Sequence, residues 1–396
     1  MSRRGRWLAS IGAVLVAGGV AAAALFFAFG DATAGPAQIA FERGEGLNPA
    51  IHLIAEDGTA ERELVPYGSG PRWSPGGHRV AFVVHSPPED VAPLDELWVV
   101  AADGSDARRA ARDASIRTIA WSPDGARIAW IGASRAGAFR LSAVDLGTGA
   151  RLTIPTQLFG PTSLDWSPDG RELLTVDGGN IVTVNLASGR KHTLRAGAAA
   201  FEAFWSPDAA RIAFVAEPER RALARAGGIQ MRLERSIFVM DADGSNVRRL
   251  TRGALDSSPS WAPAGDAIVF ARTTFSSDPV EVDSTLHVVR PGDAEPSRVT
   301  RGTDDGAPDW RPAGRPEPAV RIARAPLPEP SVEVPDLEDL GPWEATRALE
   351  EAGLTAVVRA VGGTRPRGGV LAQSPAPGAR VPPGTAVVVA YSAPRP

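Results

Sequence analysis

The sequence predicts a mainly β protein: a six-bladed β-propeller, preceded by an N-terminal transmembrane helix and followed by a small α+β domain. The first observation is a Trp-x-Pro tripeptide that occurs six times, at intervals of 48, 45, 39, 56 and 49 residues. A period in the forties, with several short apolar runs in each unit, is typical of propellers. The other observations are an uncharged N-terminal segment and a change of pattern after a proline-rich stretch. The repeated tryptophans, which we expect to pack between blades, are Trp73, Trp121, Trp166, Trp205, Trp261 and Trp310.

Each repeat contains the same series of short strands. A tight turn follows the Trp-x-Pro, as in Asp124-Gly125, and a first β-rich run comes next, as in residues 128–130. A second strand often ends in Asp-Gly, a strong hairpin signal because glycine adopts positive φ without strain. A third strand follows, and a fourth runs into the next tryptophan. Six such units predict six blades, but they leave open which strand begins a blade and how the ring closes.

The recurring Trp-Ser-Pro-Asp-Gly and Ile-Ala-Phe segments, with Asp-Ala-Asp-Gly-Ser-Asn at residues 241–246, resemble the TolB-type (WD-like) propeller repeat. The resemblance covers roughly residues 37–311. It implies a six-bladed propeller, the number that the strands themselves give. Repeats of this type occur in binding proteins, sensors and peptidase gates, so the resemblance does not specify a function.

Three predicted loops between first and second strands are long: residues 85–96, 217–235 and 272–285. Strand direction alternates, so these loops open on one face, opposite the Asp-Gly turns; we term it the long-loop face. Long loops on a rigid scaffold often carry binding residues. The second loop holds the candidate ligand-binding residues Arg220, Arg221 and Arg225. It is either a solvated, partly helical excursion or a docking loop for an anionic or protein partner.

The N-terminus has the pattern of a signal anchor over residues 1–35. Arg3, Arg4 and Arg6 precede an uncharged segment from residue 8 to residue 30, and its 23 positions suffice to span a membrane as a helix. We therefore expect a single-pass protein of the cell membrane with residues after about 31 outside the cytoplasm. Alternatively, Ala32-Thr33-Ala34 fits a cleavage site, and cleavage after Ala34 would release a secreted protein.

The rest of the chain divides into a propeller at 36–311, a proline-rich linker at 312–330 and a last domain at 331–396. The prolines predict an extended, semi-rigid spacer rather than a packed element. Beyond them, Pro342 and Gly353 fit the first turn and the C-terminal cap of one helix. Strands are expected at residues 355–361, 370–373 and 386–391.

This last segment contains Val-Pro-Asp-Leu at 334–337, Val-Leu-Ala-Gln-Ser-Pro at 370–375 and Val-Pro-Pro-Gly-Thr at 381–385. Together with the helix, these motifs resemble a PASTA domain over about residues 331–393. The family is extracellular in bacterial penicillin-binding proteins and Ser/Thr kinases, and some members bind peptidoglycan fragments. The resemblance therefore implies peptidoglycan as a partner, with Arg365 and Arg367 as candidate ligand-binding residues. A single copy lacks the avidity of several.

Catalytic signals are weak. The chain has no cysteine, which excludes thiol catalysis, disulfides and thiolate metal sites. Its five histidines show no metal-binding spacing, and G-x-S-x-G is absent. No catalytic residue, metal site or cofactor is predicted, and an enzyme is disfavoured without being excluded. Asp256, Asp304 and Asp305 precede tryptophans on the long-loop face, where a propeller enzyme could assemble its site from different blades.

We therefore expect a non-enzymatic binding or sensing protein of the cell envelope. The propeller would bind a protein partner on its long-loop face, and the PASTA domain would bind peptidoglycan. A net charge of −4 argues against nucleic acid as a partner. The alternatives are an extracytoplasmic propeller enzyme (a lyase or hydrolase) and a structural wall spacer. Carboxylates or histidines clustered in the propeller channel would favour the enzyme, and a bare channel would favour binding.

Overall fold

The computed structural model describes residues 39–393 with short gaps, at 45–47, 87–93, 134–137, 196, 218–222, 226–227, 231–233, 253–254, 276–281, 303, 315–316, 324, 326, 328–331, 339, 363–369 and 382–384. The predicted anchor at residues 1–35 lies outside the described residues. Among the residues that are described, no helix combines the length and the apolar character needed to cross a membrane.

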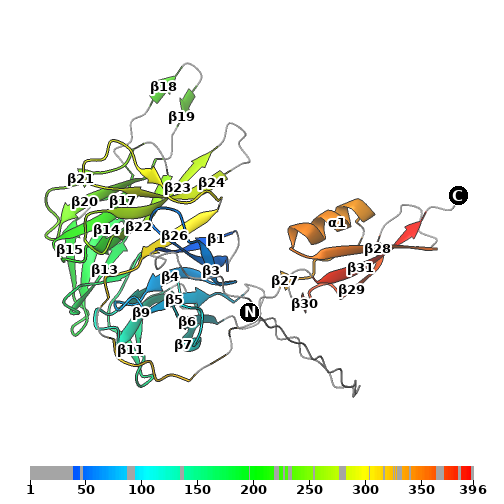
Figure 1. The fold of residues 1–396 in the computed structure, drawn as a ribbon, viewed down its shortest axis with the longest axis horizontal. Helices are drawn as coiled ribbons and strands as arrows, with labels where there is room; N and C mark the ends of the chain where they lie inside the picture. The colour runs from blue at the N-terminus through cyan, green and yellow to red at the C-terminus, as the bar shows by residue number, and fades with distance from the viewer. Residues whose placement is uncertain are drawn as a thin grey trace, which may run out of the picture. The chain divides into compact units, whose positions relative to one another are not determined.

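Six four-stranded antiparallel sheets form the larger part of the molecule, as predicted (Figure 1). From the innermost strand outward, blade 1 consists of β26 (Asp305–Trp310), β1 (Ile39–Arg43), β2 (Ala50–Ile54) and β3 (Arg62–Val65). Blade 2 consists of β4 (Ser69–Trp73), β5 (Arg79–Val84), β6 (Asp95–Ala101) and β7 (Arg108–Asp113), and blade 3 of β8 (Thr118–Trp121), β9 (Arg127–Ala133), β10 (Phe139–Asp145) and β11 (Arg151–Ile154).

Blade 4 consists of β12 (Asp165–Trp166), β13 (Glu172–Asp177), β14 (Asn180–Asn185) and β15 (Lys191–Arg195). Blade 5 consists of β16 (Ala200–Trp205), β17 (Arg211–Ala216), β20 (Ser236–Asp241) and β21 (Arg248–Arg249), and blade 6 of β22 (Leu255–Trp261), β23 (Ile268–Phe275), β24 (Val282–Val289) and β25 (Ser297–Arg298). The innermost strands contact one another around the ring, and apolar clusters fill the space between neighbouring blades.

The structure settles both points that the repeats leave open. The strand that ends in the Trp-x-Pro tryptophan is the innermost strand of the blade that follows, not the outermost of the preceding one. Blade 1 is built from both ends of the propeller sequence, since β26 pairs with β1 in a register that places Trp310 opposite Ile39. This pairing closes the ring.

Two of the predicted long loops differ from expectation. The blade 5 excursion contains a short β-hairpin, β18 (Leu223–Arg225) and β19 (Gly228–Gln230), whereas one of our two alternatives for it was a partly helical excursion. In blade 6, continuous pairing of β23 with β24 takes up most of the predicted loop.

Part of the proline-rich linker is packed against the propeller, so the expectation of an unpacked spacer is wrong for this part. The described residues between 317 and 327, which we call the strap, contact blades 2 and 3. Val320 is buried in the cluster between these blades, and the backbone N–H groups of Arg321 and Ala325 donate to Leu146 and Ala107. Proline fixes an extended backbone, and an extended backbone can also lie along a surface.

The C-terminal domain has the predicted helix and three-stranded sheet. α1 (Pro342–Glu351) buries Ala345 and Leu349 against a sheet in the order β28 (Thr355–Gly362), β31 (Ala386–Ala393), β29 (Val370–Ser374). A two-stranded pair of β27 (Val332–Glu333) and β30 (Arg380–Val381) was not predicted. The helix ends at Gly353, whose φ of +68° suits glycine. The Gln373 amide bonds backbone groups of the segment that leads into the helix.

Candidate binding site in the central channel

The Trp-x-Pro turns close the innermost hairpin of each blade. In blade 3, the buried Ser122 hydroxyl donates to Asp124 (2.5 Å) and accepts the N–H of Arg127 (2.9 Å). Gly125 then adopts a φ of +67°, which disfavours any residue with a side chain. Each residue of the Trp-Ser-Pro-Asp-Gly motif after the tryptophan therefore has a role in the turn.

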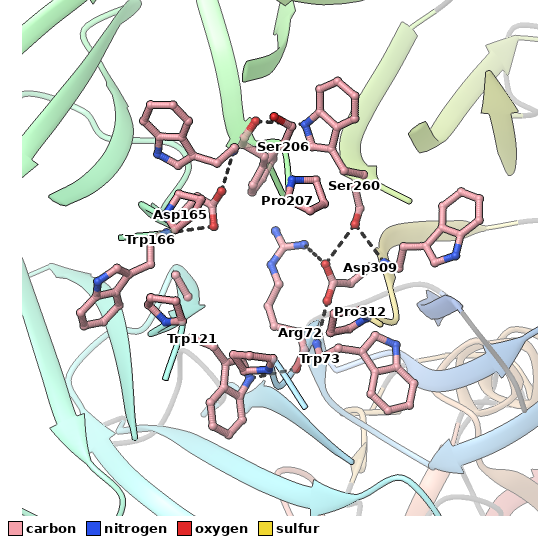
Figure 2. Close-up of a pocket in the computed structure, with 18 of the residues that line it drawn as sticks. Arg72, Trp73, Trp121, Asp165, Trp166, Ser206, Pro207, Ser260, Asp309 and Pro312 are labelled. Carbon is pink, nitrogen blue, oxygen red and sulfur yellow. Dashed lines mark hydrogen bonds and ion pairs between the residues drawn. The ribbon is translucent and has the colours of Figure 1, made fainter. Parts of the chain in front are cut away.

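All six repeated tryptophans line a cavity of about 300 Å³ at one end of the channel, together with the prolines that follow them. Figure 2 shows them arranged around this opening. Five are buried, and Trp205 is partly buried. The indole N–H of Trp121 donates to the carbonyl of Arg72 (3.1 Å), and that of Trp261 donates to Phe204 (3.3 Å). These two tryptophans therefore bond to the preceding blade.

The innermost strands have one edge that faces the channel and pairs with no other strand. Backbone N–H groups at such an edge need other acceptors. Asp165 accepts the N–H of Trp205 (2.7 Å), and Asp309 accepts the N–H of Trp73 (2.6 Å), in each case from the next blade (Figure 2). These carboxylates therefore connect neighbouring blades at the channel wall.

A second cavity of about 220 Å³ lies along the starts of the innermost strands, toward the long-loop face. Glu42 in its wall accepts the N–H of Gly70, and Glu202 accepts the N–H of Ser258. Serine and threonine contribute most of the remaining polar lining, at Ser69, Thr118, Thr162 and Ser163.

Arg72 lines both cavities, and its charge acts on Glu42, Asp165, Glu202 and Asp309. Its guanidinium lies 3.4 Å from Asp309 and over the ring of Phe204. Burial raises the pKa of Asp309, Glu42 and Glu202 above the usual range, while hydrogen bonds and the charge of Arg72 act in the opposite direction. The channel thus concentrates carboxyl groups around one arginine.

Burial also raises the pKa of Asp165, and here it brings the pKa into the neutral range. Burial raises the pKa of Asp165 to about 7, although two backbone N–H groups and Arg72 favour the charged form. This carboxyl is therefore partly protonated at neutral pH. The channel is not bare, but the hydrogen bonds to backbone show that its carboxylates already have structural partners.

The predicted ligand-binding residues fall largely outside the described part of the chain. Arg220, Arg221, Arg365 and Arg367 lie outside it, and Arg225 belongs to β18 with its side chain not described. Sequence reasoning missed the channel carboxylates: Asp165, Glu202 and Asp309 lie shortly before repeated tryptophans, whereas Glu42 has no such signal.

Of the three aspartates considered as candidates for an enzyme site, two form buried ion pairs. Asp256 and Asp305 are fully buried, and each forms a two-pronged ion pair with an arginine on the next strand, Arg272 and Arg43. Asp304 directly precedes Asp305 in the chain and has a φ of +60°. In the part of the chain that is described, no group of three or more acidic or histidine side chains could hold a metal ion.

Comparisons with known proteins agree with this architecture. The sequence profile of the PASTA domain matches residues 332–393. No curated protein matches the sequence significantly. Among solved structures, TolB from Acinetobacter baumannii is similar with a TM-score of 0.55 and 18% identity, covering 70% of this chain and 67% of that one.

Two further structures are similar at lower scores. The putative TolB from Agrobacterium tumefaciens has a TM-score of 0.44 and 19% identity over 69% of this chain and 92% of its own. An oligogalacturonate lyase in complex with manganese has a TM-score of 0.39 and 15% identity over 66% of this chain and 72% of its own. The chain therefore carries a TolB-like β-propeller followed by a PASTA domain, and the propeller likeness shows the fold alone.

Proposed function

We propose that this chain is a binding protein of the cell envelope, in which the PASTA domain binds peptidoglycan and the propeller binds a protein partner. The observation that carries the proposal is the PASTA match at residues 332–393 on the same chain as a TolB-like propeller. PASTA domains suggest binding to the cell wall, so the C-terminal domain supplies the attachment. A rigid ring with extended loops on one face supplies the platform.

The N-terminal segment supports a place for this binding outside the cytoplasm. We propose that residues 1–35 anchor the chain in the cell membrane, because three arginines precede an uncharged segment long enough to span it. The chain should then fractionate with membranes. Recovery of a soluble form that begins at Gly35 would instead establish cleavage and secretion.

Peptidoglycan carries carboxylates on its peptides, so arginines of the PASTA domain are the groups that we expect to bind it. Arg365 and Arg367 are our candidates, as the sequence predicts. One module gives weak binding because it lacks the gain that several linked modules provide. Binding through surface charge should weaken as salt screens it.

The test is sedimentation of the purified chain with insoluble peptidoglycan at low and high salt. Joint replacement of Arg365 and Arg367 by alanine should lower the fraction that sediments at low salt. Arg347→Ala is the matched control, since this exposed arginine of α1 is already paired with Glu351 at 2.7 Å. Unchanged sedimentation of the double variant would reject the two arginines, and no sedimentation of the wild-type chain would reject the function.

A further inference from the structure

Three side chains of blade 2 lie in contact, one after another, at the long-loop end of the channel. The Ser69 hydroxyl lies 2.7 Å from Nε2 of His85, and Nδ1 of His85 lies 3.1 Å from the Asp95 carboxylate. This is the order of contacts that serine nucleophiles use: hydroxyl, imidazole, carboxylate. Nothing in the spacing of the three residues along the chain resembles a known motif.

The strand register of blade 2 produces this line. Ser69 is opposite Val83, so His85, two residues further along, is its diagonal neighbour on the same side of the sheet. Val84 is opposite Glu96, so the two residues just beyond them, His85 and Asp95, meet where the next loop begins. Three adjacent antiparallel strands therefore bring the groups together.

Backbone groups hold the imidazole and the carboxylate in place. Asp95 accepts the N–H groups of Ile116 (2.7 Å) and Ser86 (3.1 Å), and the amide of Asn48 bonds both the N–H and the carbonyl of His85. The Asp95 carboxylate, 3.1 Å from Nδ1 of His85, favours the tautomer with the proton on Nδ1. In neutral His85, Nε2 is then the acceptor for the Ser69 hydroxyl.

Ser69 lies in the wall of the 220 Å³ cavity, so its hydroxyl is next to a space that a small molecule can enter. We propose that Ser69, His85 and Asp95 are the nucleophile, the general base and the orienting carboxylate of an acyl hydrolase site for small esters. This inference goes beyond the proposed binding function and does not depend on it, since the PASTA domain contributes no residue to the site.

The reaction balances with water as the only co-reactant. The Ser69 oxygen bonds to the ester carbonyl carbon while its proton moves to Nε2 of His85. The bond to the leaving alcohol then breaks, and the alcohol takes that proton, which leaves an acyl ester on Ser69. Water, with its proton again taken by His85, attacks this ester, releases the acid and restores the Ser69 hydroxyl.

The cavity defines the substrate class. Its volume of about 220 Å³ is below the usual range of drug-sized pockets, which favours short acyl groups. Two acidic side chains, Glu42 and Glu202, and two basic ones, Arg72 and Arg117, line the wall, so it favours neither sign of charge, and a charged substrate would lose hydration on entering it. The N–H of Gly70, next to Ser69, already donates to Glu42, so Arg72 and Arg117, which line the same cavity, are the groups that can stabilise the developing oxyanion. We therefore expect short, uncharged esters.

A test that needs no known substrate uses the absence of cysteine from the chain. Ser69→Cys introduces a single thiol whose thiolate form His85 should favour, because a neighbouring imidazole activates a cysteine. Alkylation by iodoacetamide at neutral pH should be at least about tenfold faster than for Ser188→Cys, an exposed serine in a turn of blade 4. Adding His85→Gln to Ser69→Cys should abolish the excess rate.

A direct assay follows hydrolysis of p-nitrophenyl acetate by the purified chain. His85→Gln should lower the rate by about 100-fold, Ser69→Ala should remove it, and Ser188→Ala should leave it unchanged. An ester with an added carboxylate should react more slowly than the acetate. A thiol at position 69 that reacts no faster than one at position 188 would overturn the proposal. A rate of ester hydrolysis that His85→Gln does not change would also overturn it, and the contacts between the three side chains would then have a purely structural role.

Discussion

Asp165 and Asp309 illustrate how single side chains stabilise the inner edge of the ring. Each accepts a backbone N–H from the next blade, at 2.7 and 2.6 Å, where no strand is available to do so. At Asp165 each carboxylate oxygen accepts one backbone N–H, Oδ1 from Trp166 and Oδ2 from Trp205. Because Asp165 is buried, its charged form is destabilised relative to its neutral form.

We predict that this cost gives the unfolding free energy a pH dependence. The pKa of Asp165 is about 7 in the folded chain and near 3.8 when unfolded, so the folded state binds the proton more tightly. This contribution is fully present below pH 4 and is lost as the pH rises to 7. At 1.36 kcal/mol per pKa unit, the loss between pH 5 and pH 8 is about 3 kcal/mol.

Urea unfolding followed by tryptophan fluorescence at pH 5 and pH 8 measures this effect. Asp165→Asn cannot titrate, so the difference between the two pH values should be smaller than in the wild-type chain by that amount. Glu295→Gln changes an exposed acid and should keep the wild-type difference. An undiminished difference in Asp165→Asn would mean that this carboxyl does not bind the proton.

At the scale of elements, the strap shows why proline-rich sequence was misread. Proline has no backbone N–H to donate within a sheet, so the sequence of this segment did not indicate a strand. The apolar residues between the prolines, Val320 and Leu327, nevertheless pack against two clusters of the propeller. Glu317 fixes its start, with a side chain only 4% exposed, 3.0 Å from Arg79 and bonded to the N–H of Gly76. Sequence alone could not distinguish a spacer from a docked segment, because both are extended.

We predict that Glu317→Ala releases the strap. The change leaves Arg79 and the N–H of Gly76 without their partner, which should destabilise this contact by about 1–3 kcal/mol. Trypsin should then cut faster after Arg321, whose backbone is bonded to Leu146 in the docked strap. Glu295→Ala is the control for loss of an exposed acid. Equal cleavage rates in both variants would show that Glu317 does not hold the strap.

For the whole molecule, the sequence predicted what repeats and missed what occurs once. Six tryptophans at a regular period predicted six blades, and cap residues such as Gly353 predicted the C-terminal helix. Closure was not predictable from the repeat, since Ile39 and Trp310 are paired across almost the entire propeller sequence. The line through Ser69, His85 and Asp95 was missed because it follows from strand register and not from a motif.

The last prediction concerns ring closure itself. The guanidinium of Arg43 in β1 bonds both oxygens of the fully buried Asp305 in β26, at 2.6 and 3.2 Å, so it joins the two ends of the propeller sequence. Arg43→Ala leaves a buried carboxylate without its cation, at a cost of about 3–5 kcal/mol. The population of the ring opened between β1 and β26 should rise by at least about 100-fold.

Blade 6 offers a matched control, because Arg272 forms the same pair with Asp256 at 2.7 and 3.0 Å within a blade that is continuous in sequence. Arg272→Ala should reduce the unfolding free energy to a similar extent without opening the ring. Hydrogen exchange of the amides in β26 separates the two cases: it should accelerate in Arg43→Ala well before the other innermost strands, and only together with them in Arg272→Ala. Uniform acceleration in both variants would show that the β1–β26 seam opens only with the whole propeller, and that closure adds no weak point to the ring.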